Sequence, residues 1–455
     1  MQVFNRHVSG RGLTVFGFET LLISGSILIA AQVHNSLPAA VNALWKIVLV
    51  TALCELCFYY NDLYDLTLVH AKRELLVRVL QAAGAAAIVL AVVSVLLPSL
   101  IIGRGILLTS LMMVLIAVPA WRLIFDGVTR DAHLVERVLL LGTGTMARTV
   151  GDQIRAQHEY AYQIVGAVGD LPDEAHGFDW PILGKSADLP QIIALHQVER
   201  IIVGITDRRG SLPIAELLHA KLAGVRVEDA ATTYERITGK LLTEGLKPSW
   251  LIFSDGFRAS RWTRMVKRCF DVMLAAVGVL LASPLMLLTA LAVRLESAGP
   301  ILYRQERVGE NGRVFTLFKF RSMRVDAESG TPVWARANDD RVTRVGRFIR
   351  LTRLDELPQL WNVLRGDMSF VGPRPERPYF VEQLAAAIPF YMERHAVKPG
   401  VTGWAQVKYR YGASIEDAME KLRYDLYYIK HLSIIFDLTI VMDTVKVILS
   451  GKGAQ

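Results

Sequence analysis

Four apolar segments occupy the first 121 residues and constrain the fold more than any other feature of the sequence. They span about residues 13–33, 43–60, 78–98 and 101–121, each close to the roughly 20 residues that a helix needs to cross a bilayer. The chain of 455 residues is 52% hydrophobic, with a positive mean hydropathy, which is too apolar for a soluble protein of this size. Residues 1–130 are therefore predicted to form a membrane bundle of four α-helices.

The positive charges around these segments predict their orientation. Lysine and arginine lie before the first segment, between the second and third, and after the fourth, at Arg6, Arg11, Lys72, Arg73, Arg78, Arg122 and Arg130. The other two loops hold almost none, so both ends of the bundle are expected in the cytoplasm. The first segment is long and has no convincing cleavage site, so it is interpreted as an anchor rather than a signal peptide. A multi-pass membrane protein is expected.

A change of pattern at Arg137 indicates a second domain. The apolar run 138–141 leads into Gly142-Thr-Gly-Thr-Met-Ala147 and a helical stretch, and further strand-like runs occur at 164–168, 200–204 and 225–229. Strands that alternate with helices predict a Rossmann-like α/β domain over residues 131–250. The glycines and Asp170 have the placement of a dinucleotide site, but a strand-to-helix turn needs the same glycines. No cofactor is assigned to this domain.

Composition excludes several other classes of protein. The net charge is +8, and the lysines and arginines cluster beside apolar segments, where binding to lipid headgroups and phosphorylated substrates explains them. No nucleic-acid module is indicated. Cys54, Cys57 and Cys269 are too few for a disulfide framework or a four-cysteine zinc site. The histidines are scattered without the spacing of metal ligands.

An uncharged stretch from Val272 to Val293 is long enough to span a bilayer but contains Ser283-Pro284 at its middle. Proline removes a helical hydrogen bond, so a kink is expected there. Basic residues flank both ends of the stretch, which favours a helix that enters and leaves by the cytoplasmic face. We therefore expect a re-entrant membrane helix over about residues 265–294, and an amphipathic, interfacial helix over 432–450.

Cationic and acidic side chains share the stretch that follows. It contains Gln305-Glu-Arg307, Lys319-Phe-Arg321-Ser-Met323, Arg353-Leu-Asp355-Glu356-Leu-Pro358-Gln359, Pro373-Arg374-Pro375 and Lys398-Pro-Gly-Val-Thr-Gly-Trp404. Transfer of a phosphosugar needs a nucleophile, a divalent cation and fixed cations. On a helix, Asp355 and Glu356 would point about 100° apart, so one could attack phosphorus while the other binds Mg²⁺. The same spacing would also fit a solvated helix face on which Asp355 and Glu356 pair with Arg350 and Arg353. The spacing alone does not decide between these two interpretations.

From Lys267 to the C-terminus, the chain resembles the monotopic polyprenyl-phosphate phosphoglycosyl transferases, the bacterial sugar transferase family. The landmarks are found in order at Lys267-Arg268 with Asp271, Ser283-Pro284, 319–323, 355–359 and 373–375. The resemblance implies a mainly α-helical catalytic domain over residues 251–455. It also implies that Asp355 attacks the β-phosphate of a UDP-sugar, releasing UMP and leaving a phosphosugar on the aspartate. Undecaprenyl phosphate then accepts the hexose-1-phosphate, in the first membrane step of exopolysaccharide or O-antigen synthesis.

The resemblance also implies roles for further residues. Glu356 would bind Mg²⁺, and Lys319, Arg321 and Arg374 would contact the phosphates or uridine of the donor, although a basic surface against lipid headgroups would explain these cations too. Lys267 and Arg268 would meet lipid or the acceptor phosphate. Glucose or galactose is the expected sugar, and a homodimer formed through the anterior domains is a reasonable expectation.

Two other functions fit parts of the sequence. A membrane-anchored, NAD-dependent nucleotide-sugar dehydratase or epimerase also carries a Rossmann domain after four spans, but no tyrosine here has a lysine four residues later, as its catalytic pair ordinarily requires. A non-catalytic scaffold for polysaccharide assembly would leave the carboxylates at 355 and 356 without a task. Loss of UMP release on substitution of Asp355 would separate the enzyme from the scaffold.

Overall fold

The computed structural model describes most of the chain in two compact units, Met1–Ile237 and Thr238–Gln455. The described residues are 10–36, 44–60, 72–97, 103–129, 136–156, 162–169, 178–205, 212–242, 260–324, 341–409 and 414–449, with a few single positions between them. Both predicted domain boundaries, near residues 130 and 250, lie outside these residues, as does Asp170.

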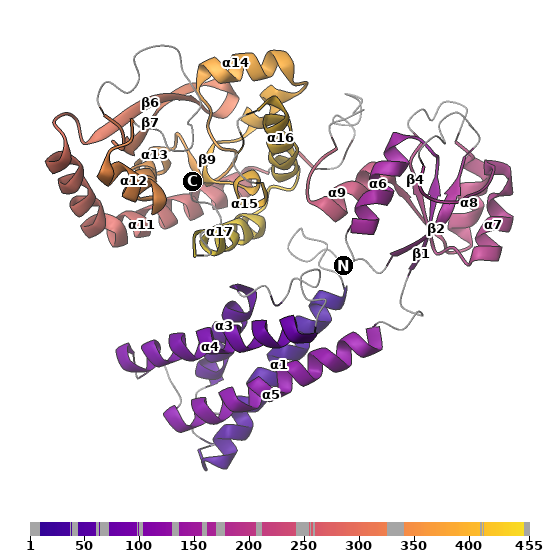
Figure 1. Cartoon of the computed structure of the whole chain (residues 1–455), viewed down its shortest axis with the longest axis horizontal. Helices are drawn as coiled ribbons and strands as arrows, with labels where there is room; N and C mark the ends of the chain where they lie inside the picture. The colour runs from indigo at the N-terminus through magenta and orange to yellow at the C-terminus, as the bar shows by residue number, and fades with distance from the viewer. Residues whose placement is uncertain are drawn as a thin grey trace. The chain divides into compact units, whose positions relative to one another are not determined.

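The N-terminal part contains the four predicted helices (Figure 1): α1 (Gly10–Val33), α3 (Leu44–Tyr60), α4 (Lys72–Leu96) and α5 (Arg104–Thr129). Ile27, Phe58 and Val118 are among the buried residues of their common core. By length and composition α1, α4 and α5 could each cross a membrane. Glu19 and Arg122 form a buried ion pair between α1 and α5, with 2.6 Å between Oε1 and Nε. Charges buried in an apolar bundle need such a partner, so this pair fixes the register of the two helices.

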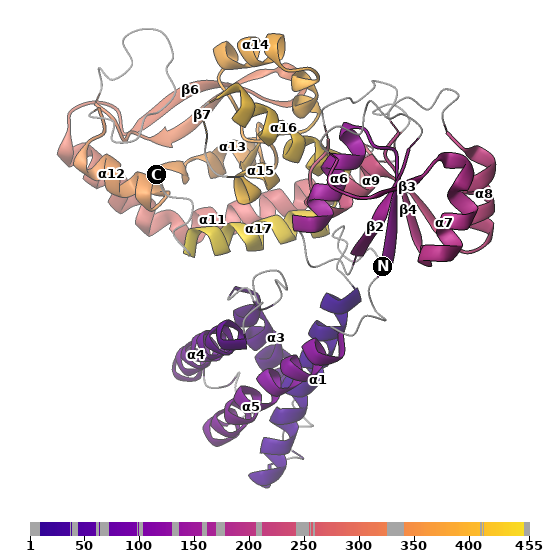
Figure 2. The ribbon, with the colours of Figure 1, turned by 45° about the vertical axis from the view of Figure 1, so that its right-hand side comes forward.

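The α/β domain is a five-stranded parallel sheet in the order β3-β2-β1-β4-β5. Its elements are β1 (Glu136–Leu141), α6 (Thr145–Ala156), β2 (Tyr162–Val168), β3 (Ile182–Gly184), α7 (Leu189–His196), β4 (Arg200–Val203), α8 (Ile214–Leu222), β5 (Arg226–Asp229) and α9 (Ala230–Thr238). Figure 2 shows α6 and α9 on one face of the sheet and α7 and α8 on the other. Right-handed crossovers place α6 on one face and α7 and α8 on the other, because the connection from β1 to β2 runs in the opposite direction to those from β3 to β4 and from β4 to β5. The predicted Rossmann-like topology is confirmed.

Close packing explains Gly142, which follows β1, and Gly204, which follows β4. Gly142 has a φ of +106°, which favours glycine, and a Cβ there would approach the backbone of Gly204 at 3.2 Å. A Cβ on Gly204 would in turn lie 2.6 Å from the Cβ of Ala147 in α6. These two glycines therefore let the helix sit against the strand ends.

The second unit contains a long helix, two short sheets and shorter helices packed around them. Its elements are α11 (Arg261–Glu296), β6 (Leu302–Val308), β7 (Val314–Phe320), α12 (Arg344–Leu351), the 3₁₀ turn η6 (Leu354–Glu356), α13 (Gln359–Arg365), β8 (Ser369–Val371), α14 (Pro378–Ala387), the 3₁₀ segment η7 (Tyr391–Ala396), β9 (Gly400–Thr402), α15 (Trp404–Lys408), α16 (Ile415–Lys430) and α17 (Ile434–Leu449). Strands β6 and β7 form an antiparallel hairpin, and β8 pairs with β9 in parallel.

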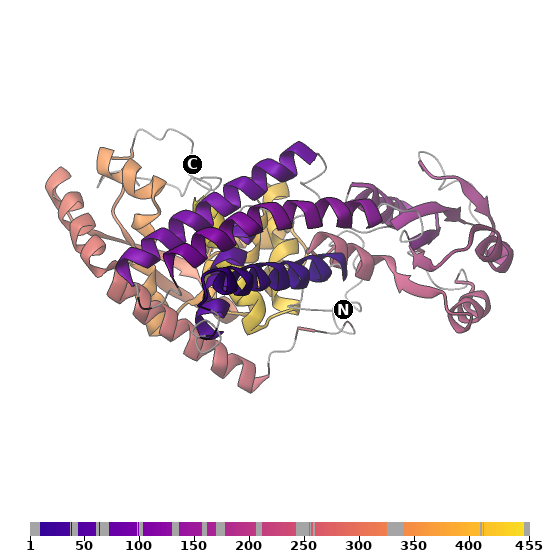
Figure 3. The same ribbon diagram turned by 90° about the horizontal axis from the view of Figure 1, so that it is seen from below.

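Helix α11 is a single helix of 36 residues with Pro284 inside it. Figure 3 shows the pink-to-salmon helix changing direction partway along its length. The missing N–H of Pro284 would otherwise donate to the Leu280 carbonyl, and the Ser283 hydroxyl donates to that carbonyl instead, at 2.8 Å. Serine therefore satisfies the polar group that proline leaves unpaired. Leu280 and Leu287 are more than 70% exposed in the chain, which leaves an apolar surface for lipid.

Candidate active site

Asp355 and Glu356 lie on the 3₁₀ turn η6, between α12 and α13, rather than on an α-helix. Arg353 precedes the turn with a φ of 60°, in the left-handed region, which is common just after the end of a helix. With three residues per 3₁₀ turn, neighbouring side chains point about 120° apart. The two carboxylates therefore face different surroundings although they are adjacent in sequence.

The turn is held in place by Asn362 of α13, which is fully buried. Its side-chain oxygen accepts a hydrogen bond from the Phe318 N–H at 3.1 Å, and its amide nitrogen donates to the Thr316 carbonyl at 2.7 Å. Both partners belong to β7, the strand that carries Lys319. One amide side chain thus fixes the position of the carboxylates relative to that lysine.

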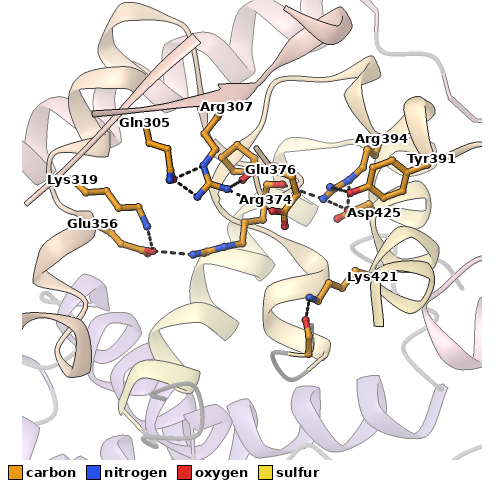
Figure 4. A network of polar contacts seen from close by, with 12 residues as sticks. Gln305, Arg307, Lys319, Glu356, Arg374, Glu376, Tyr391, Arg394, Lys421 and Asp425 are labelled. Atoms are coloured by element: carbon orange, nitrogen blue, oxygen red, sulfur yellow. Dashed lines mark hydrogen bonds and ion pairs between the residues drawn. The ribbon is translucent and has the colours of Figure 1, made fainter. Parts of the chain in front are cut away.

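Glu356 is surrounded by cations (Figure 4). Its Oε1 accepts hydrogen bonds from Lys319 Nζ at 3.0 Å and Arg374 Nη2 at 3.1 Å, and Arg353 Nη1 lies 4.0 Å away. Burial alone would raise the pKa of Glu356, but the charges of Lys319, Arg374 and Arg353 outweigh it and hold the pKa well below its usual range. Glu356 is therefore a carboxylate at every physiological pH.

Asp355 has the opposite environment. Its side chain is 7% exposed, and its Oδ1 is buried with no hydrogen-bond partner among the described residues. Burial, with the neighbouring charge of Glu356, raises the pKa of Asp355 above its ordinary value, against the smaller effects of Lys319, Arg350 and Arg353. An unpaired buried carboxylate oxygen is costly for the fold and is typical of sites that bind or react.

Lys319 and Arg374 come from separate elements. Lys319 is the penultimate residue of β7, and Arg374 follows β8 and lies between Pro373 and Pro375. Burial lowers the pKa of Lys319, and the adjacent Glu356 charge opposes this effect. The structure thus brings together four residues that the sequence singled out, Lys319, Asp355, Glu356 and Arg374, as one cluster of two carboxyl groups and two basic side chains.

The other three predicted substrate-binding residues contact the fold instead. Arg321 donates to the carbonyls of Ala298 and Ser297 at the end of α11, at 3.2 and 2.7 Å. Lys267 contacts Asp437 of α17 at 2.7 Å. Arg268 donates to two carbonyls at the end of α13, at 2.6 and 2.8 Å. These contacts hold α11 against the rest of the second unit. A role for the three residues in substrate binding stays a prediction.

Several residues near the site had no role assigned from the sequence. Arg307 of β6 donates to Gln305 and to the Pro375 carbonyl, and Arg394 of η7 pairs with Asp425 of α16 (Figure 4). Gln305 and Arg307 belong to the Gln305-Glu-Arg307 motif, so the sequence pointed to them without giving them a role. Nothing in the sequence links Arg394 with Asp425, because their pairing depends on how η7 packs against α16.

Magnesium requires few protein ligands, since it usually keeps several waters and shares its coordination with substrate phosphates. The described residues contain no group of three His, Cys, Asp or Glu side chains that could hold an ion. The unpaired Asp355 Oδ1 and the ionised Glu356 nevertheless offer oxygen ligands of the type that Mg²⁺ prefers. Asp355 and Glu356 could thus supply two oxygen ligands to such an ion, with waters or a bound anion as the others.

Comparison with known proteins places this site in a family. A model described as bacterial sugar transferase matches residues 262–451, and one described as CoA-binding domain matches residues 60–210. A UDP-N-acetylgalactosamine-undecaprenyl-phosphate N-acetylgalactosaminephosphotransferase of Aeromonas hydrophila is 44% identical over 239 residues, or 52% of this chain and 56% of the relative. An undecaprenyl-phosphate glucose phosphotransferase of Komagataeibacter xylinus is 32% identical over 332 residues, covering 70% of this chain and 60% of the relative.

A shorter relative is matched over nearly its whole length. The exopolysaccharide production protein PSS of Rhizobium leguminosarum bv. phaseoli is 40% identical over 200 residues, which are 42% of this chain and 98% of the relative. The chain spans somewhat more than half the length of the two longer relatives above. With the family model over its C-terminal part, these similarities show that the chain belongs to the bacterial sugar transferase family, the polyprenyl-phosphate phosphoglycosyl transferases.

Proposed function

We propose that this protein transfers a hexose-1-phosphate from a UDP-sugar to undecaprenyl phosphate and releases UMP. The proposal rests on two adjacent carboxyl groups. Asp355 has a buried oxygen without a hydrogen-bond partner among the described residues, and Lys319 and Arg374 hold Glu356 ionised. Relatives named for this class of transfer support it. The reaction would begin a repeat unit of an exopolysaccharide or O-antigen.

The proposed chemistry has two displacements at phosphorus. The Asp355 carboxylate attacks the β-phosphorus of the donor, the bond from that phosphorus to the bridging oxygen breaks, and UMP leaves with the electron pair. An oxygen of the polyprenyl phosphate then attacks the same phosphorus, and the Asp355 carboxylate leaves. Lys319 and Arg374 would stabilise the charge that develops on the phosphoryl oxygens. The unpaired Oδ1 suits a nucleophile because no hydrogen bond in the described fold occupies its lone pairs.

We also propose that Mg²⁺ is bound by Glu356, with Asp355 and the donor diphosphate nearby. Bound there, Mg²⁺ would neutralise part of the diphosphate charge. The contacts from Lys319 and Arg374 both meet Oε1 of Glu356, which leaves its second oxygen as the candidate ligand.

Turnover with purified lipid acceptor tests this function directly. In detergent or nanodiscs, with undecaprenyl phosphate and Mg²⁺, at least one of UDP-glucose, UDP-galactose and UDP-N-acetylgalactosamine is expected to yield UMP and a lipid-linked phosphosugar. Removing divalent cations with EDTA should stop UMP release, and added Mg²⁺ should restore it. UMP release that needs NAD, or no release with any UDP-sugar, would refute the proposal.

We propose that α11 enters and leaves the membrane by the cytoplasmic face, so that the active site faces the cytoplasm of a bacterial inner membrane. A cysteine at position 347, where the arginine of α12 is exposed, tests this in a background without Cys54, Cys57 and Cys269. In intact spheroplasts the residue is expected to resist an impermeant maleimide and to react after lysis. Labelling before lysis would show that α11 crosses.

A further inference from the structure

The backbone of the loop that carries Arg374 is held by hydrogen bonds from three other elements, β6, η7 and β9. Four successive carbonyl oxygens each accept a hydrogen bond from another element. The pairs are Gly400 N to Pro373 O at 2.9 Å, Arg394 Nη2 to Arg374 O at 3.1 Å, Arg307 Nη1 to Pro375 O at 2.9 Å and Val308 N to Glu376 O at 2.9 Å. Two of these donors are backbone groups of strands, and the other two are guanidinium groups.

Arg394 is buried, with 5% of its side chain exposed. Its Nε and Nη2 donate to Oδ2 of Asp425 at 3.1 and 2.8 Å, and its Nη1 donates to the Tyr391 hydroxyl at 2.8 Å. The contact with the Arg374 carbonyl uses Nη2 as well, so the same nitrogen joins Asp425 to the loop (Figure 4). Asp425, 2% exposed, thereby fixes the direction in which the guanidinium points.

Stability alone is a weak reason for this arrangement. Replacing a buried ion pair by well-packed apolar residues is often neutral or stabilising, because taking two charges out of water is costly. A planar guanidinium does what an apolar residue cannot, since it holds a carboxylate and a carbonyl in one fixed geometry. The carbonyl it holds belongs to the residue whose side chain contacts Glu356.

We propose that Arg394 and Asp425 are positioning residues for Arg374. They fix the backbone at Arg374 so that its guanidinium meets the Oε1 of Glu356 and, in the reaction, the phosphoryl oxygens of the donor. The inference rests on the proposed function. It predicts that disturbing the pair acts through Arg374 and lowers kcat/KM for the donor, because small displacements of a positioned group cost about 10²-fold in rate.

A double-mutant cycle tests the positioning role. Arg394→Lys keeps the charge but cannot hold both partners in one plane, and Asp425→Asn keeps the shape but loses the charge. Each is expected to lower kcat/KM for UMP release by about 10-fold to 100-fold. In an Arg374→Ala background the same changes should have less than about a threefold further effect, because the residue through which they act is gone.

Tyr391→Phe is the matched control. It removes a hydroxyl from the same buried cluster and leaves the contact between Arg394 and the Arg374 carbonyl in place, so kcat/KM should stay within about twofold. The positioning role would be overturned, and the proposed function left standing, by either of two results. One is that Arg394→Lys and Asp425→Asn lower kcat/KM as much in the Arg374→Ala background as in the parent, and the other is that Tyr391→Phe lowers it equally. A parent protein that releases no UMP would overturn both this inference and the proposed function.

Discussion

Replacing Asp355 by asparagine is expected to lower UMP release by about 10³-fold or more, as loss of the nucleophile does in other covalent enzymes. The substitution keeps the size of the side chain and removes the attacking oxygen. With donor and Mg²⁺ but no lipid acceptor, the parent should accumulate a phosphosugar on the peptide that contains Asp355, detectable by mass spectrometry. The Asp355→Asn protein should show no such adduct.

The stability of the same variant separates a catalytic role from a structural one. Because the pKa of Asp355 is raised in the folded chain, the folded state favours its protonated form, and the ionised side chain costs stability at neutral pH. Asparagine removes this cost, so the unfolding temperature should stay the same or rise. Groups that destabilise the fold while serving the reaction are expected at active sites.

Asp179→Asn is the control for these measurements. Asp179 forms an exposed ion pair with Arg155 in the α/β domain, with 53% of its side chain exposed, and exposed pairs of this kind contribute little. Both UMP release and unfolding temperature should match the parent. An Asp355→Asn protein that keeps the parental rate would contradict the nucleophile assignment and leave a non-catalytic scaffold as the better account.

The helices of the N-terminal part could be predicted closely because their signal is local. An apolar run at 43–60 becomes a helix at Leu44–Tyr60, and the run at 13–33 ends at the same residue as α1. The parallel sheet was also predictable from its alternation with helices. Strand β3 was not, because it has only three residues and pairs with the end of β2, and a segment that short carries no periodic pattern.

The candidate site was only partly predictable, because motifs fix which residues are near one another in sequence but not which way they point. Lys319 and Arg321 are two positions apart, and on one continuous strand they would share a face. Strand β7 ends at Phe320, and although the Arg321 N–H still donates to the Ile301 carbonyl at 2.9 Å, the Arg321 side chain donates to carbonyls at the end of α11. The end of the strand thus separates two cations that the motif presents as a pair.

The pair of Arg394 and Asp425 shows a second limit. The two residues are 31 positions apart, on η7 and α16, and each alone is an ordinary charged residue in a helical segment. Their contact depends on the packing of two elements that meet only in the folded chain. Long-range pairs of this kind are set by tertiary structure, and a single sequence does not reveal them.

Lys319→Met is expected to destabilise the catalytic unit and abolish UMP release. It leaves the Glu356 side chain, which is 13% exposed, with one cation fewer, and losing a hydrogen bond to a charged group costs about 1.5–3 kcal/mol. For a unit of this size, such a loss lowers the unfolding temperature by about 3–12 °C. Scanning calorimetry or intrinsic fluorescence in detergent would measure the shift.

The double variant Lys319→Met/Glu356→Gln then separates stability from catalysis. Removing the charge of Glu356 as well takes away the carboxylate that has lost a partner, so most of the lost unfolding temperature should return, with a coupling of about 1–3 kcal/mol between the two sites. UMP release should stay absent, because the proposed metal ligand and the cation beside the phosphoryl group are both gone. Additive losses in stability would mean that Arg374 and Arg353 already balance the charge of Glu356. Recovery of UMP release would show that neither Lys319 nor Glu356 serves the reaction.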